Sequence, residues 1–144
     1  MNTNKKTARI LEDVKINVKI KLSALWVALM LCYTYADILG FYAPGNLEEL
    51  MSGEIAGIQM TQAMLFGSAM LMAIPTVMVF LSLTMKAKAN RLANIIAGLV
   101  YMGVLGSTFL TGRNPAYYIF YAIGKAMLIA LIVWHAWKWP KKEA

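Results

Sequence analysis

The chain has 144 residues, of which 60% are hydrophobic and 15% are charged, and its formal net charge is +7. A soluble domain is nearer half apolar and a quarter charged, so this composition excludes an ordinary soluble domain. Apolar stretches of about 18 or more residues recur along the chain, which predicts an integral membrane protein with one all-α domain.

The first 21 residues are basic and precede the first long apolar stretch. Residues 1–9 ("MNTNKKTAR") have the composition of a disordered tail. The segment "DVKINVKIKL" alternates apolar and polar residues, which favours a strand, but a lone strand cannot satisfy its backbone in a membrane. We therefore expect residues 1–21 to form a basic cytoplasmic tail and an interfacial helix with snorkelling lysines.

Four apolar spans follow, at about residues 22–42, 55–85, 92–111 and 116–137. Each can cross a hydrocarbon core about 30 Å thick at about 1.5 Å per residue. Pro75 should bend the second, longest span, and the preceding loop should hold a short surface helix with Asn46 as its N-cap. Because short loops favour antiparallel neighbours, residues 22–139 predict an up-down-up-down four-helix bundle, followed by a basic tail at 140–144.

Small residues recur at helical spacing in the last two spans. Ala122, Ala126 and Ala130 are four residues apart, and Gly103 precedes Ser107 by four. Such spacing lets membrane helices approach closely, and the pattern leaves open whether these faces pack within one bundle or between chains. Four helices enclose little volume, so we expect a homo-oligomer.

The basic residues lie mostly on one side of the predicted bundle. Twelve of the fourteen belong to this side: Lys5, Lys6, Arg9, Lys15, Lys19, Lys21, Lys86, Lys88, Arg91, Lys138, Lys141 and Lys142. By the positive-inside rule, the N- and C-termini should both be cytoplasmic. The positive charge then reflects topology and attraction to anionic lipids at the cytoplasmic face, and we expect no nucleic-acid partner.

Residue inventory argues against several chemistries. The chain has one cysteine, Cys32, whereas disulfide exchange needs a pair, and one histidine, His135, whereas haem ligation by two histidines needs more. No metal-ligand cluster, glycine-rich phosphate loop or nucleophile–base motif is evident. We therefore expect no enzymatic activity, no catalytic residue, no cofactor and no metal.

Two ionisable residues lie inside the spans, Asp37 in the first and Lys125 in the fourth. Each costs a few kcal/mol near the bilayer centre. Helical side chains lean toward the N-terminus of their own helix, so the two charged groups should converge in the outer half of the bundle. The sequence thus predicts an Asp37–Lys125 ion pair.

Polar residues should gather at a similar depth. Tyr33, Thr34 and Asp37 share a face of the first span, and Gln59 and Gln62 share a face of the second. The full candidate set for ligand binding or ion pairing is Asp37, Lys125, Tyr33, Thr34, Gln59, Gln62, Thr108, Tyr118 and Tyr121. Together these residues predict a polar pocket that opens outward.

Five stretches together touch all four spans: "LEDVKINVKIKLSALW", "YADILGFYAPG", "VFLSLTMKAKANRLANI", "YYIFYAI" and "WHAWKWP". In these the chain resembles an uncharacterised family of short four-helix prokaryotic membrane proteins, known as a domain of unknown function. The resemblance implies a multi-pass protein of the prokaryotic cytoplasmic (inner) membrane. It implies no activity, substrate or cofactor.

Two functions are favoured by the residues, and a membrane enzyme of unrecognised type is a third, weaker option. In the first, the protein binds or transports a small solute or ion through the outward-facing polar pocket. In the second, it is a non-catalytic structural or accessory membrane protein in which the Asp37–Lys125 pair only stabilises the bundle. Intramembrane charges favour the first, and the frequent structural use of paired buried charges favours the second.

Overall fold

The computed structural model describes residues 14–55, 57–111 and 115–140. Its long helices are α1 (Val18–Phe41), α3 (Gln62–Thr84), α4 (Ala87–Thr111) and α5 (Ala116–Trp137). A short helix, α2 (Asn46–Met51), and a two-stranded hairpin of β1 (Glu54–Ile55) and β2 (Ile58–Gln59) lie between α1 and α3. All four long helices are long and apolar enough to cross a membrane.

Two helix starts differ from the expected boundaries. Residues 14–17 are not helical, and α1 begins at Val18 because the Asn17 side chain accepts a hydrogen bond from the Lys19 backbone N–H at 2.9 Å. The second span was expected from residue 55, but α3 begins only at Gln62. Gly57, at φ 77°, supports the turn between β1 and β2, and Thr61 caps α3 through the Met64 N–H at 3.3 Å.

The start of α2 also differs from the prediction. Gly45, at φ 84°, occupies the N-cap position that was expected for Asn46. The Asn46 amide instead donates a hydrogen bond back to the Gly40 carbonyl at 3.1 Å. This contact ties the surface helix to the end of α1.

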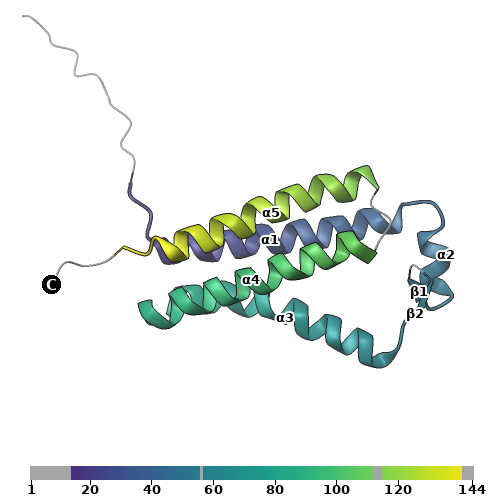
Figure 1. The fold of residues 1–144 in the computed structure, drawn as a ribbon, viewed down its shortest axis with the longest axis horizontal. Coiled ribbons are helices and arrows are strands. Elements are labelled where there is room, and N and C mark those ends of the chain that lie inside the picture. Colours follow the sequence, from purple (N-terminus) through teal and green to yellow (C-terminus); the bar gives the residue numbers. More distant parts are fainter. Residues whose placement is uncertain (1–13, 56, 112–114, 141–144) are drawn as a thin grey trace, which may run out of the picture.

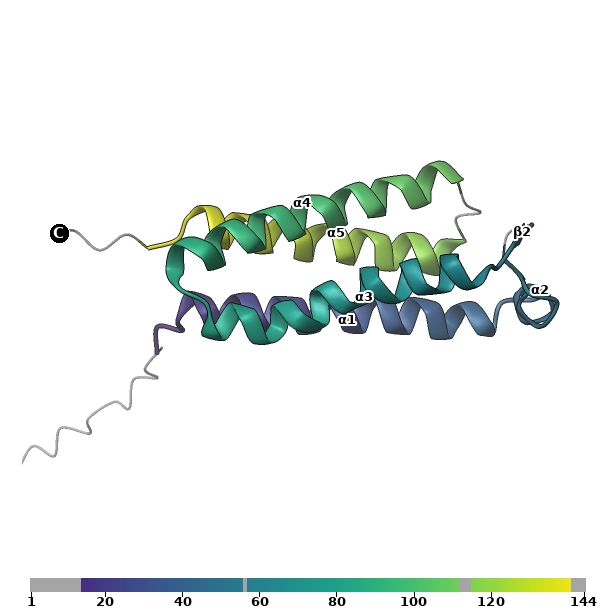
Figure 2. The same cartoon turned by 90° about the horizontal axis from the view of Figure 1, so that it is seen from below.

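The long helices pack together, and the most extensive contact among them joins α1 to α5. α3 packs against the other side of α1, and α4 against α5 (Figures 1 and 2). α3 and α4 follow each other in sequence but contact each other little, and α3 diverges from the other helices toward its N-terminal end (Figure 1). The main contacts are thus α1 with α5, α4 with α5 and α1 with α3, and two of these three pairs join long helices that are consecutive in the sequence.

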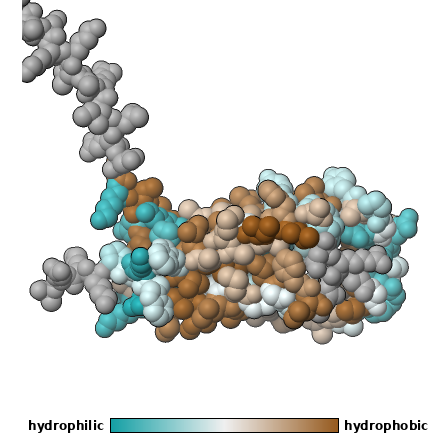
Figure 3. All heavy atoms as spheres, turned by 45° about the horizontal axis from the view of Figure 1, so that its top comes forward, coloured by the Kyte–Doolittle hydropathy of each residue, from teal (hydrophilic) through white to brown (hydrophobic). Residues whose placement is uncertain are grey.

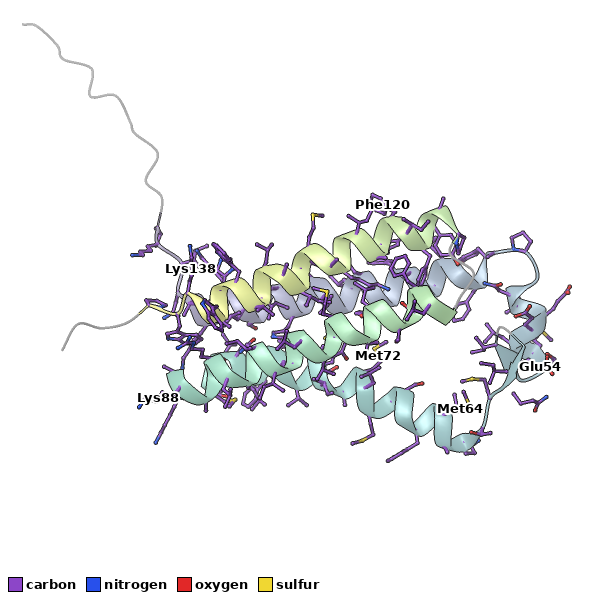
Figure 4. All side chains as sticks on the ribbon, in the orientation of Figure 1. Glu54, Met64, Met72, Lys88, Phe120 and Lys138 are labelled. Carbon is purple, nitrogen blue, oxygen red and sulfur yellow. The ribbon has the colours of Figure 1, made fainter. Side chains whose placement is uncertain are left out.

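The two ends of the bundle differ in charge. One end, here called the basic end, carries Lys19, Lys21, Lys86, Lys88 and Lys138. The other, here called the loop end, carries α2 and the hairpin. Figure 4 shows Lys88 and Lys138 at the first and Glu54 at the second. In Figure 3 the hydrophobic surface forms a central band with hydrophilic residues at both ends, as expected for a membrane-spanning bundle.

Pro75 lies between an exposed N-terminal part of α3 and a C-terminal part that packs into the bundle. Proline has no backbone N–H, so the carbonyl of Leu71, four residues earlier, has no helical partner. The Tyr101 hydroxyl of α4 donates a hydrogen bond to that carbonyl at 2.5 Å. Before this point, every residue from 62 to 70 is exposed, whereas Pro75, Met78 and Ser82 beyond it are buried.

The core runs from the basic end to the middle of the bundle. Leu22, Trp26 and Leu29 of α1 are fully buried, as are Ile129 and Ile132 of α5. Two hydrogen bonds join α1 to α3 in this region. The Ser23 hydroxyl donates to the Val79 carbonyl at 2.9 Å, and the Lys19 ammonium donates to the Met85 carbonyl at 2.8 Å. The second contact satisfies a C-terminal carbonyl of α3 with a positive charge, which suits the helix dipole.

Candidate functional site

Lys125 is the charged residue that the fold buries most deeply. It lies on the face of α5 that also carries Ala122 and Ile129, and its side chain is only 1% exposed. Its ammonium lies 4.1 Å from the centre of the Tyr33 ring and 5.0 Å from the centre of the Tyr118 ring. In the part of the chain that the structure describes, this ammonium makes no hydrogen bond and no ion pair.

Tyr33 joins this cation to the aromatic core. Its ring packs edge-to-face against Tyr101 at 5.8 Å, and Tyr101 packs the same way against Trp26 at 5.9 Å. The Tyr33 hydroxyl is buried and has no hydrogen-bond partner among the described residues. A buried hydroxyl without a partner costs about 1–3 kcal/mol, so the site contains two polar groups whose bonding capacity is unused.

The expected ion pair between Asp37 and Lys125 is not formed. Asp37 is exposed, and within residues 14–55, 57–111 and 115–140 no carboxylate oxygen lies within 4.0 Å of the Lys125 ammonium. The groups beside the ammonium are instead the rings of Tyr33 and Tyr118.

The other candidate residues do not form one cluster. Gln59 lies in β2, where its amide donates to Glu54 at 3.2 Å, so it does not share a helix face with the exposed Gln62. The Thr108 hydroxyl donates to the Leu105 carbonyl of its own helix at 2.7 Å. Tyr121 packs edge-to-face on Phe120 at 5.6 Å. Of the predicted polar partners, Tyr33 and Tyr118 are those whose rings lie under the Lys125 ammonium in the described part of the chain.

Two grooves on the described part of the protein lie elsewhere. One, of about 280 Å³, lies between α1 and α3 and includes Thr34 together with Thr76. The other, of about 300 Å³, lies between α4 and α5. Neither includes Lys125, Tyr33 or Asp37. In this conformation the Lys125 site is closed, unlike the outward-facing pocket that the sequence predicted.

A second polar cluster was missed from the sequence. Asn94 is fully buried, and its side-chain oxygen accepts from the Trp26 indole at 2.7 Å. Its amide donates to the Asn90 side-chain oxygen at 2.7 Å, and the Asn90 amide donates to the Ser82 carbonyl at 2.6 Å. The available signal was the four-residue spacing of two asparagines inside an apolar span, which places both on one helix face.

The site offers few chemical groups for a reaction. Among the described residues no group of three or more His, Cys, Asp or Glu could hold a metal ion. The Lys125 ammonium can donate up to three hydrogen bonds, and the Tyr33 hydroxyl can donate or accept. An anion or a neutral acceptor such as a carbonyl oxygen is the kind of group that this pair can bind.

The chain was compared with known proteins and families. Neither the curated proteins nor the solved structures gave a match. A family described as "Family of unknown function (DUF6326)" matches residues 9–144, which is nearly the whole chain. The protein therefore belongs to the DUF6326 family, a family of unknown function whose member described here has four candidate membrane-spanning helices.

Proposed function

We propose that this protein spans the cytoplasmic membrane of a prokaryote four times, with its basic end in the cytoplasm. The four apolar helices support the spans. The five lysines of the basic end, set against Glu48, Glu49 and Glu54 at or near the loop end, support the orientation through the positive-inside rule.

Within that membrane, the protein binds a small solute or ion through an anionic or acceptor group held by Lys125. One observation carries this proposal: the Lys125 ammonium is 1% exposed and has no carboxylate within 4.0 Å among the described residues. Desolvating such a cation costs several kcal/mol, whereas ring contacts return about 0.5–2 kcal/mol each. A bound anion or acceptor would supply the missing stabilisation.

A ligand must reach Lys125 from the loop end. The side of Lys125 toward the basic end is filled by buried Leu29, Ile129 and Ile132. Toward the loop end, Asp37 and residues 62–70 of α3 are exposed. Binding therefore requires the rings of Tyr33 or Tyr118 to move, and transport would require a further opening toward the basic end.

Exposure of the α3 segment also bears on assembly. In a single chain, residues 62–70 are all exposed, and none of them belongs to the buried hydrophobic core. A homo-oligomer in which this segment packs on a second copy would enclose a larger volume near Asp37.

We further propose that the protein catalyses no reaction, because Lys125, Tyr33 and Tyr118 form no nucleophile–base pair.

A structural or accessory role is the second candidate. The close contacts of the Lys125 ammonium with two tyrosine rings favour it, as does the absence of Lys125 from both grooves. In that case the contact between the Tyr33 ring of α1 and Lys125 holds α1 to α5, and no ligand enters.

An anion titration separates these functions. The protein in lipid nanodiscs is titrated with sodium acetate, chloride and phosphate at constant ionic strength, and the thermal unfolding midpoint is measured. A binding role predicts that at least one anion raises the midpoint of the native protein and leaves Lys125→Met unchanged. Lys88→Met removes the same charge at an exposed position and is the control. Equal shifts in all three proteins, or no shift, would contradict the binding role.

A further inference from the structure

The groove between α4 and α5 lies in the half of the bundle nearer the basic end. Its walls include Leu99 of α4 and Ala130 and Val133 of α5, and it extends to Trp134 and Trp137 near the end of α5. All its lining residues are glycine, aliphatic, methionine or tryptophan. Leu99 is 60% exposed and Trp137 65%, so the groove faces the surroundings of the bundle and not its interior.

Two cations stand at the tryptophan end of this groove. The Arg91 guanidinium lies over the Trp137 ring at 5.7 Å, and the Lys138 ammonium lies over the Trp134 ring at 4.0 Å. Both tryptophans line the groove. The apolar groove therefore ends at two positive charges, Arg91 on α4 and Lys138 directly after α5.

Arg91 has unused hydrogen-bonding capacity. Its Nε atom is buried and has no partner among the described residues. A guanidinium is suited to bidentate binding of phosphate, so an incoming phosphate oxygen would satisfy a donor that has no partner among the described residues.

We propose that this groove binds one anionic phospholipid of the surrounding bilayer. An acyl chain lies along Leu99, Ala130 and Val133, and the head-group phosphate contacts Arg91 and Lys138. Tryptophan and cationic residues at this position match the depth of the membrane interface, where lipid head groups lie. The site is separate from Lys125 and does not depend on the proposed ligand there.

The two cations, Arg91 and Lys138, determine which lipid head group the site prefers, whereas the apolar groove does not distinguish between lipids. Lipid tails are as apolar as the groove walls, so tail burial alone does not favour one lipid over another. Basic pockets between membrane helices recognise anionic head groups. The structure therefore predicts preference for a negatively charged head group over a zwitterionic one with the same tails.

Lipid retention in native mass spectrometry tests the proposal. The full-length protein in detergent is mixed with equal amounts of phosphatidylglycerol and phosphatidylcholine that carry the same acyl chains. We expect one phosphatidylglycerol to be retained preferentially. Lys138→Gln and Arg91→Gln should each lower the ratio of retained phosphatidylglycerol to phosphatidylcholine about fivefold, the effect of one charge near the interface.

Two controls make the result specific to the groove. Lys21→Gln removes one charge from an exposed position at the same end, and it should leave the ratio unchanged. Ala130→Trp fills the groove and should abolish the retained lipid, whereas Ile123→Trp, on the same helix outside the groove, should not.

Three outcomes would overturn the proposal. The first is equal retention of the two lipids by the native protein, and the second is an equal loss in Lys21→Gln and Lys138→Gln. The third is full retention by Ala130→Trp. Because Lys138 is exposed, its variant gives a clear answer even if Arg91→Gln fails to fold.

Discussion

The hydroxyl of Tyr101 on α4 donates a hydrogen bond of 2.5 Å to the backbone carbonyl of Leu71 on α3. Pro75 leaves that carbonyl without its helical N–H partner. One side chain thus satisfies the backbone at the point where α3 leaves the bundle, and it also packs against Trp26 and Tyr33.

Tyr101→Phe should destabilise the protein by about 1 kcal/mol, because it removes this hydrogen bond but keeps the ring contacts. The free energy of unfolding in dodecyl sulfate mixed micelles measures the change. Tyr121→Phe is the matched control, since the structure gives Tyr121 only a ring contact with Phe120. Equal effects of the two substitutions would contradict the assigned role of Tyr101.

Asn94→Leu should cost about 1–3 kcal/mol, because it leaves the buried indole N–H of Trp26 without its acceptor. A double-mutant cycle with Trp26→Phe isolates this interaction and should give a coupling energy of about 0.5–3 kcal/mol. A coupling energy of zero in the same unfolding assay would mean that the bond contributes no stability.

Gly98→Ala should destabilise the contact between α4 and α5 by about 1–3 kcal/mol. A Cβ atom at Gly98 would lie 2.6 Å from a Val133 methyl group. Adding Val133→Ala should recover part of the loss.

Gly103→Ala is the control for that prediction, because nothing lies within 4 Å of a Cβ there. It should be neutral or stabilising, since alanine favours a helix over glycine by up to about 1 kcal/mol. If both glycine variants lose stability equally, the close approach at Gly98 is not the cause.

Asp37→Asn should change the free energy of unfolding by no more than about 0.5 kcal/mol, because Asp37 is exposed and forms no ion pair with Lys125. The same assay checks this value. If Asp37→Asn instead costs several kcal/mol, and adding Lys125→Met reverses that loss, then the two residues form the structural ion pair that the sequence suggested.

The sequence predicted the four membrane helices well, because long apolar runs mark them directly. It also identified Lys125 and its neighbours Tyr33 and Tyr118. Depth along a helix can be counted in residues, but the direction in which a face points depends on which helices pack together. The structure shows no Asp37–Lys125 ion pair among the described residues, and Gln59 does not share a helix face with Gln62 because Gln59 lies in β2.

Other features depend on packing that sequence spacing does not reveal. Gly103 and Ser107 suggested a tight face, yet the close helix approach occurs at Gly98. Asn90 and Asn94 were missed because the predicted polar cluster lay in the outer half of the bundle, whereas these two residues lie in the half nearer Lys86 and Lys88. The short loop between α3 and α4 suggested that these two helices pack closely along their length. They contact each other little, and α3 diverges from the bundle.

The central claim is that Lys125 is kept for a ligand and not for stability. The most direct test is the free energy of unfolding of Lys125→Met in nanodiscs without added anions. Replacing a buried, unpaired charge with an apolar side chain of similar volume is expected to stabilise a protein by about 1–4 kcal/mol. We predict that Lys125→Met is more stable than the native protein. A loss of stability would show that the ring contacts with Tyr33 and Tyr118 hold the bundle together, and would contradict the claim.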